Sequence, residues 1–506
     1  MNLRPLRRVL IANRGEIALR IMRACRDEGL ETVAAYSDAD RYAPFVRVAD
    51  RAVRIGPAAP VESYLRIAVL LEAARASGAD AVHPGYGFLA ERAAFAQAVD
   101  DAGLIFIGPP ASAISAMGDK TSARRLMAAA GVPIVPGSLA ALSDPDEAAA
   151  VAREIGYPVL VKAAAGGGGK GMRVVAAPRE LAAALATASS EATKAFGDGS
   201  VYLEKYIERP RHVEIQILAD HERTIHIGER ECSIQRRHQK LVEEAPSIAV
   251  DEALRERMGA AAVAAGVAVG YRGAGTCEFL LASNGDFFFL EMNTRIQVEH
   301  PVTEEVYGVD LVREQLRIAG GRAMSVPYGR LVPRGWAIEC RITSEDPANG
   351  LLPSAGLIRW MRAPAGPGVR WESGVETGSE VTLFYDSMLA KLVVHAPDRR
   401  QAIDVMQRAL SELTIVGVAT NVPFHRALLA DPEFLAGTID IQFLDRRADL
   451  LAAADDAATT MRLAVAAALL ADDRRLSRRG TVPAAAPERV ASSSAWAATA
   501  RRDALR

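Results

Sequence analysis

Hydrophobic and polar residues near the start of the chain follow two alternating patterns. Short apolar runs at residues 9–12, 32–36, 81–83 and 104–107 predict strands, and residues 16–28 and 64–76 carry apolar side chains at helical spacing. Strands that alternate with amphipathic helices predict a doubly wound parallel sheet covered by helices. Only Gly15 occupies the first strand-to-helix turn, so the GxGxxG fingerprint of a dinucleotide site is absent.

The middle of the chain changes to a period of two residues. Residues 117–130 predict a helical link, and 135–207 predict a small separate domain, because a glycine-rich loop lies there between two strand-helix units. Four further runs predict an antiparallel sheet: 213–218, 224–227, 275–281 and 287–292. Short strands and a helix at 401–413 follow. The Ala/Arg/Asp/Ser-rich tail after residue 445 predicts one amphipathic helix, 459–471, and a final stretch that is poorly ordered alone.

Composition narrows the class of protein. The 506 residues suggest about three or four domains, and 50% hydrophobic with 24% charged residues indicates a globular chain. A formal charge of −2 gives no overall attraction to nucleic acid or to an anionic membrane. No apolar run approaches the roughly 17 to 25 residues of a membrane-spanning helix, and the start lacks a secretory h-region. The four cysteines are far apart, which favours a reduced, cytoplasmic compartment.

A phosphate-binding loop is the first chemical signal. The apolar run 158–161 delivers Lys162, and four successive glycines, 166–169, follow before Lys170. Glycines let backbone N–H groups approach phosphate oxygens, and Lys162 adds a point charge. In a Walker A loop the lysine follows the glycines, so this loop indicates another class of nucleotide site. The alternative is a flexible linker, which usually contains serine and lacks a preceding buried strand.

A second signal lies in the hairpin at residues 275–292. If Asn284 and Gly285 form a two-residue turn, Glu278 and Glu291 are directly opposite each other. Like charges in that position are destabilising unless cations compensate them. Asn293 lies two residues beyond Glu291, on the same face, and two carboxylates with an amide oxygen suit Mg²⁺. A solvated outer face is the alternative, against which the apolar run 287–290 argues.

The polar alternation continues beyond the hairpin and brings a cation, an amide and a carboxylate next to the predicted metal site. Such a group suits a small anion and a base; its members are Arg295, Gln297 and Glu299. A basic cluster earlier in the chain would by itself more often be a solvated face than a site; it comprises Arg236, Arg237, His238 and Lys240.

Together these residues resemble the biotin carboxylases of the ATP-grasp superfamily. The resemblance covers about residues 5 to 445 in the family's order. Its matching stretches are IANRGEIALRIMRAC from Ile11, HPGYGFLAE from His83, MGDK from Met117, VKAAAGGGGKGM from Val161, LEKYIERPRHVEIQ from Leu203, GERECSIQRRHQKLVEEAP from Gly228, EMNTRIQVEHPVTE from Glu291 and CRITSEDPANGLLPS from Cys340.

The resemblance implies an α/β and α+β protein with a defined order of parts. These are a doubly wound pre-ATP-grasp domain (1–115), a helical link (116–134), an ATP-grasp lid (135–207), a C-terminal catalytic domain with an antiparallel sheet (208–446), and an Ala/Arg-rich tail that docks partners or is partly disordered (447–506).

It also implies roles for individual residues. The ATP contacts are Lys120, Lys162, Gly168, Gly169, the adenine hinge Glu204, Lys205, Tyr206 and Ile207, then His212, Gln235, His238, Glu278 and Glu291. The ligands for two Mg²⁺ or Mn²⁺ ions are Glu278, Glu291 and Asn293. The bicarbonate pocket comprises Lys240, Arg295, Gln297 and Val298, with Glu299 as the general base and Arg341 at the biotin enolate.

The implied reaction joins these roles in sequence. Glu299 removes the bicarbonate proton, and the oxyanion attacks the γ-phosphate of ATP to form carboxyphosphate, which yields CO₂ and phosphate. Phosphate then deprotonates the biotin ureido N1, while Arg341 stabilises the enolate oxygen. Because carboxyphosphate is labile, the lid must exclude water. Cys232 with Lys240 is an alternative base pair, but Cys232 more simply reads as a strand residue.

The absence of a biotinylation motif from this sequence indicates which partner proteins to expect. No Met-Lys-Met biotinylation motif occurs, so biotin is expected on a separate carrier protein, and a carboxyltransferase subunit is expected to choose the acyl acceptor. Acetyl-CoA or propionyl-CoA is preferred, because the tail resembles the connecting region of acyl-CoA carboxylase α subunits; pyruvate, as in split pyruvate carboxylases, is the alternative. The family implies a homodimer. Local departures occur at Arg92 and at Thr343-Ser344.

Two other functions compete with this interpretation. One is a different ATP-grasp ligase that makes a phosphorylated carboxylate for an amine. The other is a nucleotide-sensing scaffold without activity, against which the complete set of residues argues, namely Glu278, Glu291, Asn293, Arg295, Glu299 and Arg341.

Overall fold

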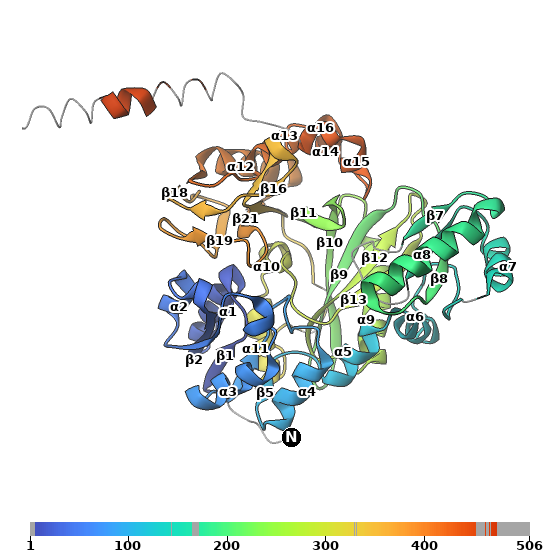
Figure 1. Ribbon diagram of the computed structural model, residues 1–506, viewed down its shortest axis with the longest axis horizontal. Coiled ribbons are helices and arrows are strands. Elements are labelled where there is room, and N and C mark those ends of the chain that lie inside the picture. The colour runs from blue at the N-terminus through green and yellow to red at the C-terminus, as the bar shows by residue number, and fades with distance from the viewer. Residues whose placement is uncertain are drawn as a thin grey trace, which may run out of the picture. The chain divides into compact units, whose positions relative to one another are not determined.

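The computed structural model describes residues 6–142, 144–163, 172–327, 329, 331–451, 461, 465 and 467–472 (Figure 1). The chain divides into two units, Met1–Ala453 and Ala454–Arg506, and each is described by itself. Among the described residues, no helix has the length and apolar character that crossing a membrane requires.

The first unit opens with a five-stranded, all-parallel sheet in the order β3-β2-β1-β4-β5. The predicted doubly wound arrangement is thereby confirmed. Its strands are β1 (Arg8–Ile11), β2 (Glu31–Ser37), β3 (Arg51–Gly56), β4 (Ala81–His83) and β5 (Ile105–Phe106), and its helices are α1 (Gly15–Asp27), α2 (Pro44–Val48), α3 (Ile67–Ser77) and α4 (Ala93–Asp101).

Strand order reverses between β1 and β4, which is where ligands bind in open α/β sheets. The segment after β4 therefore reaches the active-site side with Tyr86 and Glu91. Strand β3 was absent from the expected elements because it is an edge strand in which Arg51, Ala52 and Arg54 are exposed, so it contains no apolar run.

The helical link predicted at 117–130 consists of the end of one helix and the whole of a second. Helix α5 (Ala111–Gly118) ends before Asp119, and α6 (Lys120–Ala129) begins after it. Asp119 has extended backbone, and its carboxylate accepts a hydrogen bond from the Ser122 N–H at 2.6 Å, which caps α6. The break puts Lys120 in the first turn of a helix, where N–H groups favour an anion.

A small antiparallel sheet with its own core follows, in the order β7-β6-β8. Helices α7 and α8 pack against it (Figure 1). Buried side chains between the layers include Val159, Val161, Leu185 and Leu203. The elements are α7 (Pro145–Ile155), β6 (Val159–Ala163), β7 (Arg173–Val175), α8 (Leu181–Phe196) and β8 (Val201–Lys205). The glycine loop with Gly168 and Gly169 lies outside the described residues.

The largest element is an eight-stranded sheet in the order β13-β12-β9-β10-β11-β14-β21-β19. All of its pairings are antiparallel, which confirms the predicted arrangement. Its strands are β9 (Arg211–Ala219), β10 (Thr224–Arg236), β11 (Gln239–Ala245), β12 (Gly273–Leu281), β13 (Phe287–Asn293), β14 (Trp336–Thr343), β19 (Val369–Ser373) and β21 (Met388–Ala396).

The two faces of this sheet have different chemistry because side chains alternate along each strand. On β9, Val213, Ile215 and Ile217 enter a hydrophobic core beneath α9, whereas His212 and Glu214 point to the opposite, polar face. Burying the apolar face fixes the register, so the polar face is presented in one arrangement only.

The β12–β13 turn differs from the expected two-residue turn. Ala282 N–H donates to Asp286 O at 2.8 Å, so the loop has three residues, and Gly285 adopts a φ of +84°. A bulge at Leu290 offsets the extra loop residue. Glu278 and Glu291 are therefore paired as predicted, although the turn that predicted it is wrong.

The remaining elements complete the first unit and cover the large sheet. Helix α12, for example, buries Ile403, Met406 and Leu410 against β14 and β21. They are α9 (Glu252–Ala268), α10 (His300–Tyr307), α11 (Leu311–Ala319), β15 (Glu345–Asp346), β16 (Leu352–Pro353), β17 (Gly356–Leu357), β18 (Trp360–Arg362), β20 (Glu380–Val381), α12 (Arg399–Glu412), β22 (Thr414–Val416), α13 (Val422–Leu428), α14 (Pro432–Ala436), α15 (Phe443–Arg446) and α16 (Ala448–Leu451).

In the second unit, the described residues 461, 465 and 467–472 are helical and exposed, and they extend one residue beyond the predicted helix 459–471. The rest of the predicted tail lies outside the described residues.

Candidate active site

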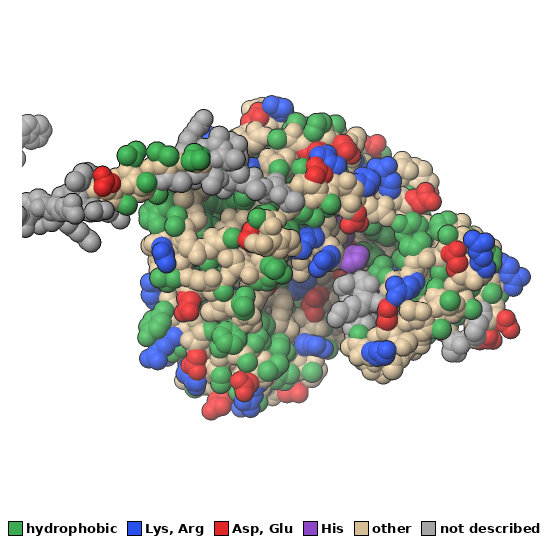
Figure 2. Space-filling view, turned by 45° about the horizontal axis from the view of Figure 1, so that its top comes forward, with side chains coloured by type: hydrophobic (Ala, Val, Ile, Leu, Met, Phe, Trp, Pro, Cys, Tyr) green, Lys and Arg blue, Asp and Glu red, His purple; other side chains and the backbone are tan. Residues whose placement is uncertain are grey.

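A cavity of about 920 Å³ is lined by residues of the eight-stranded sheet, the three-stranded sheet and the segment that follows β4. Figure 2 shows Lys and Arg, acidic side chains and a histidine gathered around a hollow on this face. Every predicted site residue that the structure describes lines it: Lys120, Lys162, Glu204, Lys205, Tyr206, Ile207, His212, Gln235, His238, Lys240, Glu278, Glu291, Asn293, Arg295, Gln297, Val298, Glu299 and Arg341.

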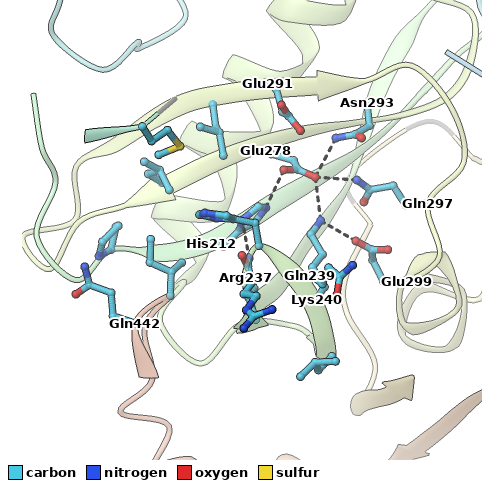
Figure 3. A pocket seen from close by; sticks show the side chains of 18 of the residues that line it. His212, Arg237, Gln239, Lys240, Glu278, Glu291, Asn293, Gln297, Glu299 and Gln442 are labelled. Atoms are coloured by element: carbon cyan, nitrogen blue, oxygen red, sulfur yellow. Dashed lines mark hydrogen bonds and ion pairs between the residues drawn. The ribbon is translucent and has the colours of Figure 1, made fainter. Parts of the chain in front are cut away.

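Lys240 is the central cation of the polar face (Figure 3). Its Nζ donates to Glu214 at 2.6 Å, to Glu299 at 2.7 Å and to Glu278 at 2.9 Å. Burial alone would lower the pKa of Lys240, but the three carboxylates raise it well above its ordinary value. The lysine is therefore a permanent charge, not a proton donor at neutral pH.

Glu299 lies between two cations. One carboxylate oxygen accepts from Lys240, and the other accepts from Arg341 Nη2 at 2.9 Å. Burial alone would raise the pKa of Glu299, but Lys240, Arg341 and Arg230 lower it well below the ordinary value. Glu299 is thus ionised throughout the neutral range, in a position where the same two cations can also contact a substrate anion.

Arg230 supports this arrangement from beneath and was not among the predicted site residues. It is fully buried, and all five guanidinium N–H groups are used. Its acceptors are Glu214 (2.5 Å), Gln216 (2.7 Å), Thr303 (2.9 Å), Thr276 (3.0 Å) and Gln297 (3.0 Å).

The alternation on β9 contained the signal for Glu214. His212, Glu214 and Gln216 occupy one face of the strand, and Glu214 pairs in register with Glu278 on one side and with Arg230 on the other. Pairing β9 with the predicted hairpin would therefore have added Glu214 and then its counterion.

Two lysines meet at the other end of the cavity. Lys162 on β6 forms an ion pair with Glu204 at 2.5 Å, and Arg124 of α6 also contacts Glu204. Burial lowers the pKa of Lys120, and the charge of Lys162 lowers it further, although Glu291 acts in the opposite direction. Two neighbouring cations of this kind are suited to a polyanion such as a nucleotide phosphate.

The rim of the cavity near β8 is apolar and can accept the planar ring of a nucleobase. The predicted hinge residue Ile207 lies there, whereas the Lys205 ammonium points into structure and donates to Gly156 O and Tyr157 O at 2.9 and 3.0 Å. Tyr206 contributes a hydroxyl that accepts from Gln442 at 2.5 Å. The apolar lining comprises Val135, Leu160, Met172, Ile207, Leu280, Leu290 and Ile441.

The basic cluster is divided by the β10–β11 turn. Arg237 and His238 form its two central positions with φ of +49° and +65°, a conformation that asparagine and glycine prefer. Arg237, His238 and Lys240 line the cavity, whereas Arg236 donates to Gly350 O at 2.8 Å. The alternative of a wholly solvated face is therefore excluded for this cluster.

The carboxylate pair has the chemistry of a divalent-metal site, in which the Glu278 oxygens already have protein partners. Glu278 accepts from Asn293 and Gln297, each at 2.9 Å, and lies 3.0 Å from His212 Nε2. The Glu291 side chain is exposed to the cavity. Partial loss of solvent around its carboxylate and the negative charge of Glu278 raise the pKa of Glu291. Two opposed carboxylates, one with a raised pKa, fit a cation that would neutralise both.

Asn293 is oriented by its neighbours. Its amide nitrogen donates to Glu278, and its oxygen accepts from Arg295 Nη2 at 2.8 Å. Arg295 also donates to Glu91 at 2.9 Å. Residues 294–299 form no strand, so the expected continuation of the polar alternation is wrong; Arg295, Gln297 and Glu299 nevertheless reach one cavity.

Cys232 does not behave as a base. It is buried on β10, and burial raises the pKa of its thiol well above the ordinary value, an effect that Glu214 strengthens. Lys240 instead contacts carboxylates, including Glu299. The geometry therefore favours Glu299 over a Cys232–Lys240 pair.

Glu243, the second carboxylate that contacts Arg341, is expected to make the stability of the first unit depend on pH. Burial raises the pKa of Glu243 from 4.5 to about 7 against the pull of Arg341. A raised carboxyl pKa means that the folded state binds the extra proton between pH 4.5 and 7, so the stability contributed by Glu243 falls as pH rises through that window. We expect Glu243→Gln to gain about 3 kcal/mol relative to the parent protein between pH 4.5 and pH 8.

Chemical unfolding of both proteins across that pH range measures this difference. Glu412→Gln, which changes a partly exposed carboxylate on α12, is the matched control and should leave the pH dependence unchanged. A pH-independent difference between Glu243→Gln and the parent would contradict the assignment.

Known protein families match this chain along most of its length. Three family profiles do so: Biotin carboxylase, N-terminal domain, over residues 5–114; Carbamoyl-phosphate synthase L chain, ATP binding domain, over 119–326; and Biotin carboxylase C-terminal domain, over 339–446.

Individual proteins agree with the profiles. A pyruvate carboxylase subunit from Methanothermobacter thermautotrophicus is 54% identical over 87% of this chain and 89% of its own length. Biotin carboxylase 1 of Bacillus subtilis is 52% identical over 87% of this chain and 98% of its own. The biotin carboxylase domain dimer of Hydrogenobacter thermophilus 2-oxoglutarate carboxylase is 45% identical, with a TM-score of 0.84 over 89% of this chain and 100% of that one.

The chain therefore belongs to the biotin carboxylase family. It is an ATP-dependent ligase with an ATP-grasp domain, and its reaction is the carboxylation of biotin.

Proposed function

We propose that the cavity activates bicarbonate at its Lys240 end and holds ATP phosphates at its Lys120 end. The observation that carries this assignment is the position of Glu299, whose two oxygens contact Lys240 at 2.7 Å and Arg341 at 2.9 Å. A base between two fixed cations, in a cavity shared with two phosphate-suited lysines, matches the needs of carboxyphosphate formation. The Hydrogenobacter structure contains MgADP and bicarbonate, which supports the same ligands here.

The chemistry follows from the charges. Bicarbonate entering beside Lys240 and Arg295 shares the cations that hold Glu299, which weakens their effect on the Glu299 pKa and makes this carboxylate a better base. Glu299 accepts the proton as the bicarbonate oxygen attacks the γ-phosphorus and ADP leaves. Lys120 and Lys162 stabilise charge on the phosphate oxygens.

The second step uses Arg341. After carboxyphosphate breaks into CO₂ and phosphate, phosphate takes the proton from the biotin ureido N1, and N1 attacks CO₂. The charge that develops on the ureido oxygen requires a nearby donor. Arg341 is held for this role by Glu243 at 2.6 Å, and two carboxylate partners keep its pKa above the ordinary value.

Mg²⁺ or Mn²⁺ would be held by Glu278 and Glu291, with Asn293 as the third predicted ligand. When bound, these ions supply positive charge between the protein carboxylates and the nucleotide phosphates. The protein's own contribution is to keep both carboxylates on adjacent strands in direct register.

The small sheet at 135–207 is proposed to act as the lid. It contributes Lys162 and the hinge residues of β8 to the cavity, while its core is separate from that of the large sheet. Residues 1–115 and 208–446 are the proposed flanking domains, joined through the link 116–134.

The experiment that tests the function is Mg²⁺-dependent ATP hydrolysis by the purified chain with bicarbonate, with and without free biotin. We expect biotin to stimulate hydrolysis and bicarbonate to be required. An active ATPase that responds neither to free biotin nor to a biotinylated carrier protein would instead favour another ATP-grasp carboxylate ligase. ATP binding without hydrolysis under any of these conditions would favour a nucleotide-sensing scaffold.

The acceptor of the carboxyl group is assigned to partner subunits. We propose acetyl-CoA or propionyl-CoA, because the Ala/Arg-rich tail resembles the connecting region of acyl-CoA carboxylase α subunits. Pyruvate is the second candidate, supported by the 54% identity to the Methanothermobacter pyruvate carboxylase chain. Carboxylation assays of the assembled enzyme with each acceptor distinguish them.

Residues 447–506 are proposed to dock the carboxyltransferase subunit or the biotin carrier protein. Within the described helix, four apolar side chains are between 51% and 66% exposed: Met461, Val465, Leu469 and Leu470. Deleting 454–506 should abolish co-purification with these partners and change the rate with free biotin by less than twofold. Co-purification that survives the deletion would contradict the docking role.

The first unit is proposed to form a homodimer, as does the Hydrogenobacter domain. Light scattering of the purified chain should give twice the monomer mass of 53.9 kDa.

A further inference from the structure

Lys391 is a buried cation on β21 that does not line the cavity described above. Its side chain has 0% exposure. The ammonium lies 2.9 Å from Glu372 and 3.2 Å from Glu16, and it donates to the Val298 carbonyl oxygen at 3.0 Å. Two ion pairs and one hydrogen bond therefore surround this ammonium group.

The three partners of the Lys391 ammonium come from three separate segments of the chain. Glu16 belongs to α1 of the N-terminal sheet, and its carboxylate also accepts from the hydroxyl of the cavity-lining Tyr86. Glu372 belongs to β19, directly opposite Lys391 in the sheet. Val298 belongs to the segment that carries the proposed base. One ammonium thus ties α1 and the sheet edge to the active-site backbone.

The hydrogen bond from Lys391 to the Val298 carbonyl acts on the backbone next to Glu299. Residues 294–299 lie between the end of β13 and the start of α10, and they form neither a strand nor a helix that would fix them. The Val298 carbonyl belongs to the peptide that joins Val298 to Glu299. Orienting that peptide sets the direction of the Glu299 side chain, which must remain between Lys240 and Arg341.

The pairing of β21 with its neighbouring strands explains why the buried position 391 can hold a positive charge. Lys391 pairs in register with Arg341 on β14, so two cations are adjacent across the strands. Glu243 and Glu299 satisfy Arg341, and Glu16 and Glu372 satisfy Lys391. Each cation therefore has its own pair of carboxylates, and the Val298 carbonyl is the additional partner of Lys391 on the active-site side.

We propose that Lys391 is a positioning residue for bicarbonate activation, acting through the Val298–Glu299 peptide. This inference rests on the proposed role of Glu299. A residue that only stabilised the fold would affect all substrates alike, whereas this contact reaches the bicarbonate end of the cavity and not the phosphate end.

The test compares two variants under the biotin-dependent assay. Lys391→Met alone would leave the buried Glu16 carboxylate without its cation, whereas Glu372 keeps Arg370, so the informative variant is the double substitution Lys391→Met/Glu16→Gln, which removes both charges together. Glu16→Gln alone is the matched control, because it keeps the contact of Lys391 with Val298. KM for bicarbonate, KM for ATP, kcat and the thermal unfolding midpoint are measured for each.

We expect the double variant to raise KM for bicarbonate about tenfold over Glu16→Gln, with KM for ATP within twofold. A folded double variant with the bicarbonate KM of the control, or with equal increases in both KM values, would overturn the proposal. Absence of bicarbonate-dependent turnover in the parent protein would instead overturn the proposed function, so the two failures are distinguishable.

Discussion

Glu299→Gln is expected to lower kcat for biotin carboxylation by about 10²- to 10⁴-fold, the usual contribution of a positioned general base. The amide has nearly the same shape but cannot accept the bicarbonate proton. Lys240 keeps Glu214 and Glu278 as partners, and Arg341 keeps Glu243, so neither cation is left without a carboxylate. Steady-state kinetics with free biotin measure the loss.

Binding separates a chemical effect from a structural one in this variant. KM for ATP should stay within twofold, because Glu299 contacts Lys240 and Arg341 and not the phosphate-suited Lys120 or Lys162. Glu412→Gln on α12 serves as the control for an equivalent substitution far from the cavity. Retention of more than a tenth of the parent rate by Glu299→Gln would assign the base to another group.

Arg230→Met is expected to destabilise the first unit by about 3–5 kcal/mol, as when one partner of a buried ion pair is removed. The guanidinium is fully buried, and its loss leaves the Glu214 charge short of one counterion and removes the donors to Gln216, Gln297 and two threonines. Because Gln297 connects Arg230 to Glu278, activity should fall as well. Chemical and thermal unfolding measure the change.

Arg400→Met on α12 is the matched control. Its guanidinium is 72% exposed and pairs with Asp404 one helical turn away, so its removal should change stability by no more than about 0.5 kcal/mol. Arg230→Lys adds a second comparison, since it keeps the charge but has fewer donors. An Arg230→Met protein that unfolds with the parent midpoint would show that the acceptors find other partners.

Sequence patterns predicted four of the five strands of the parallel sheet and four of the eight strands of the large sheet, because burial imposes a strict period on them. The apolar side chains of β9 and β12 follow the period of two that a half-buried strand requires, and those of α1 and α12 follow the helical period. Strand β3 and the break at Asp119 were missed for local reasons. An exposed edge strand needs no apolar run, and a single capping residue interrupts a helix without disturbing its pattern.

The site residues that could be predicted are those whose role follows from a sequence motif or from their position on one face of a strand. Glu278 and Glu291 follow from hairpin pairing, and Glu299 follows from the resemblance. Arg230 and Lys391 do not, because their importance comes from contacts made across strands and domains that are distant in the chain. A lysine in an apolar strand such as β21 carries no local sign of whether it meets solvent or three buried acceptors.

The hairpin that carries the carboxylate pair has a consequence for how the chain tolerates changes in length. The turn at 283–285 and the bulge at Leu290 are separate features, and the ladder between them ends in the Phe279–Phe289 pair. Because the bulge lies between the turn and Glu291, shortening the turn by one residue would leave every rung of the ladder, and hence the Glu278–Glu291 pairing, in place. Deleting Leu290 would remove the bulge and make Phe289 and Glu291 consecutive, opposite Phe279 and Glu278, so the regular ladder that results would also keep the carboxylate pair. The pairing of the two carboxylates is thus insulated from the loss of one residue at the tip of the hairpin and from the loss of the bulged residue, which protects the catalytic register from variation in hairpin length.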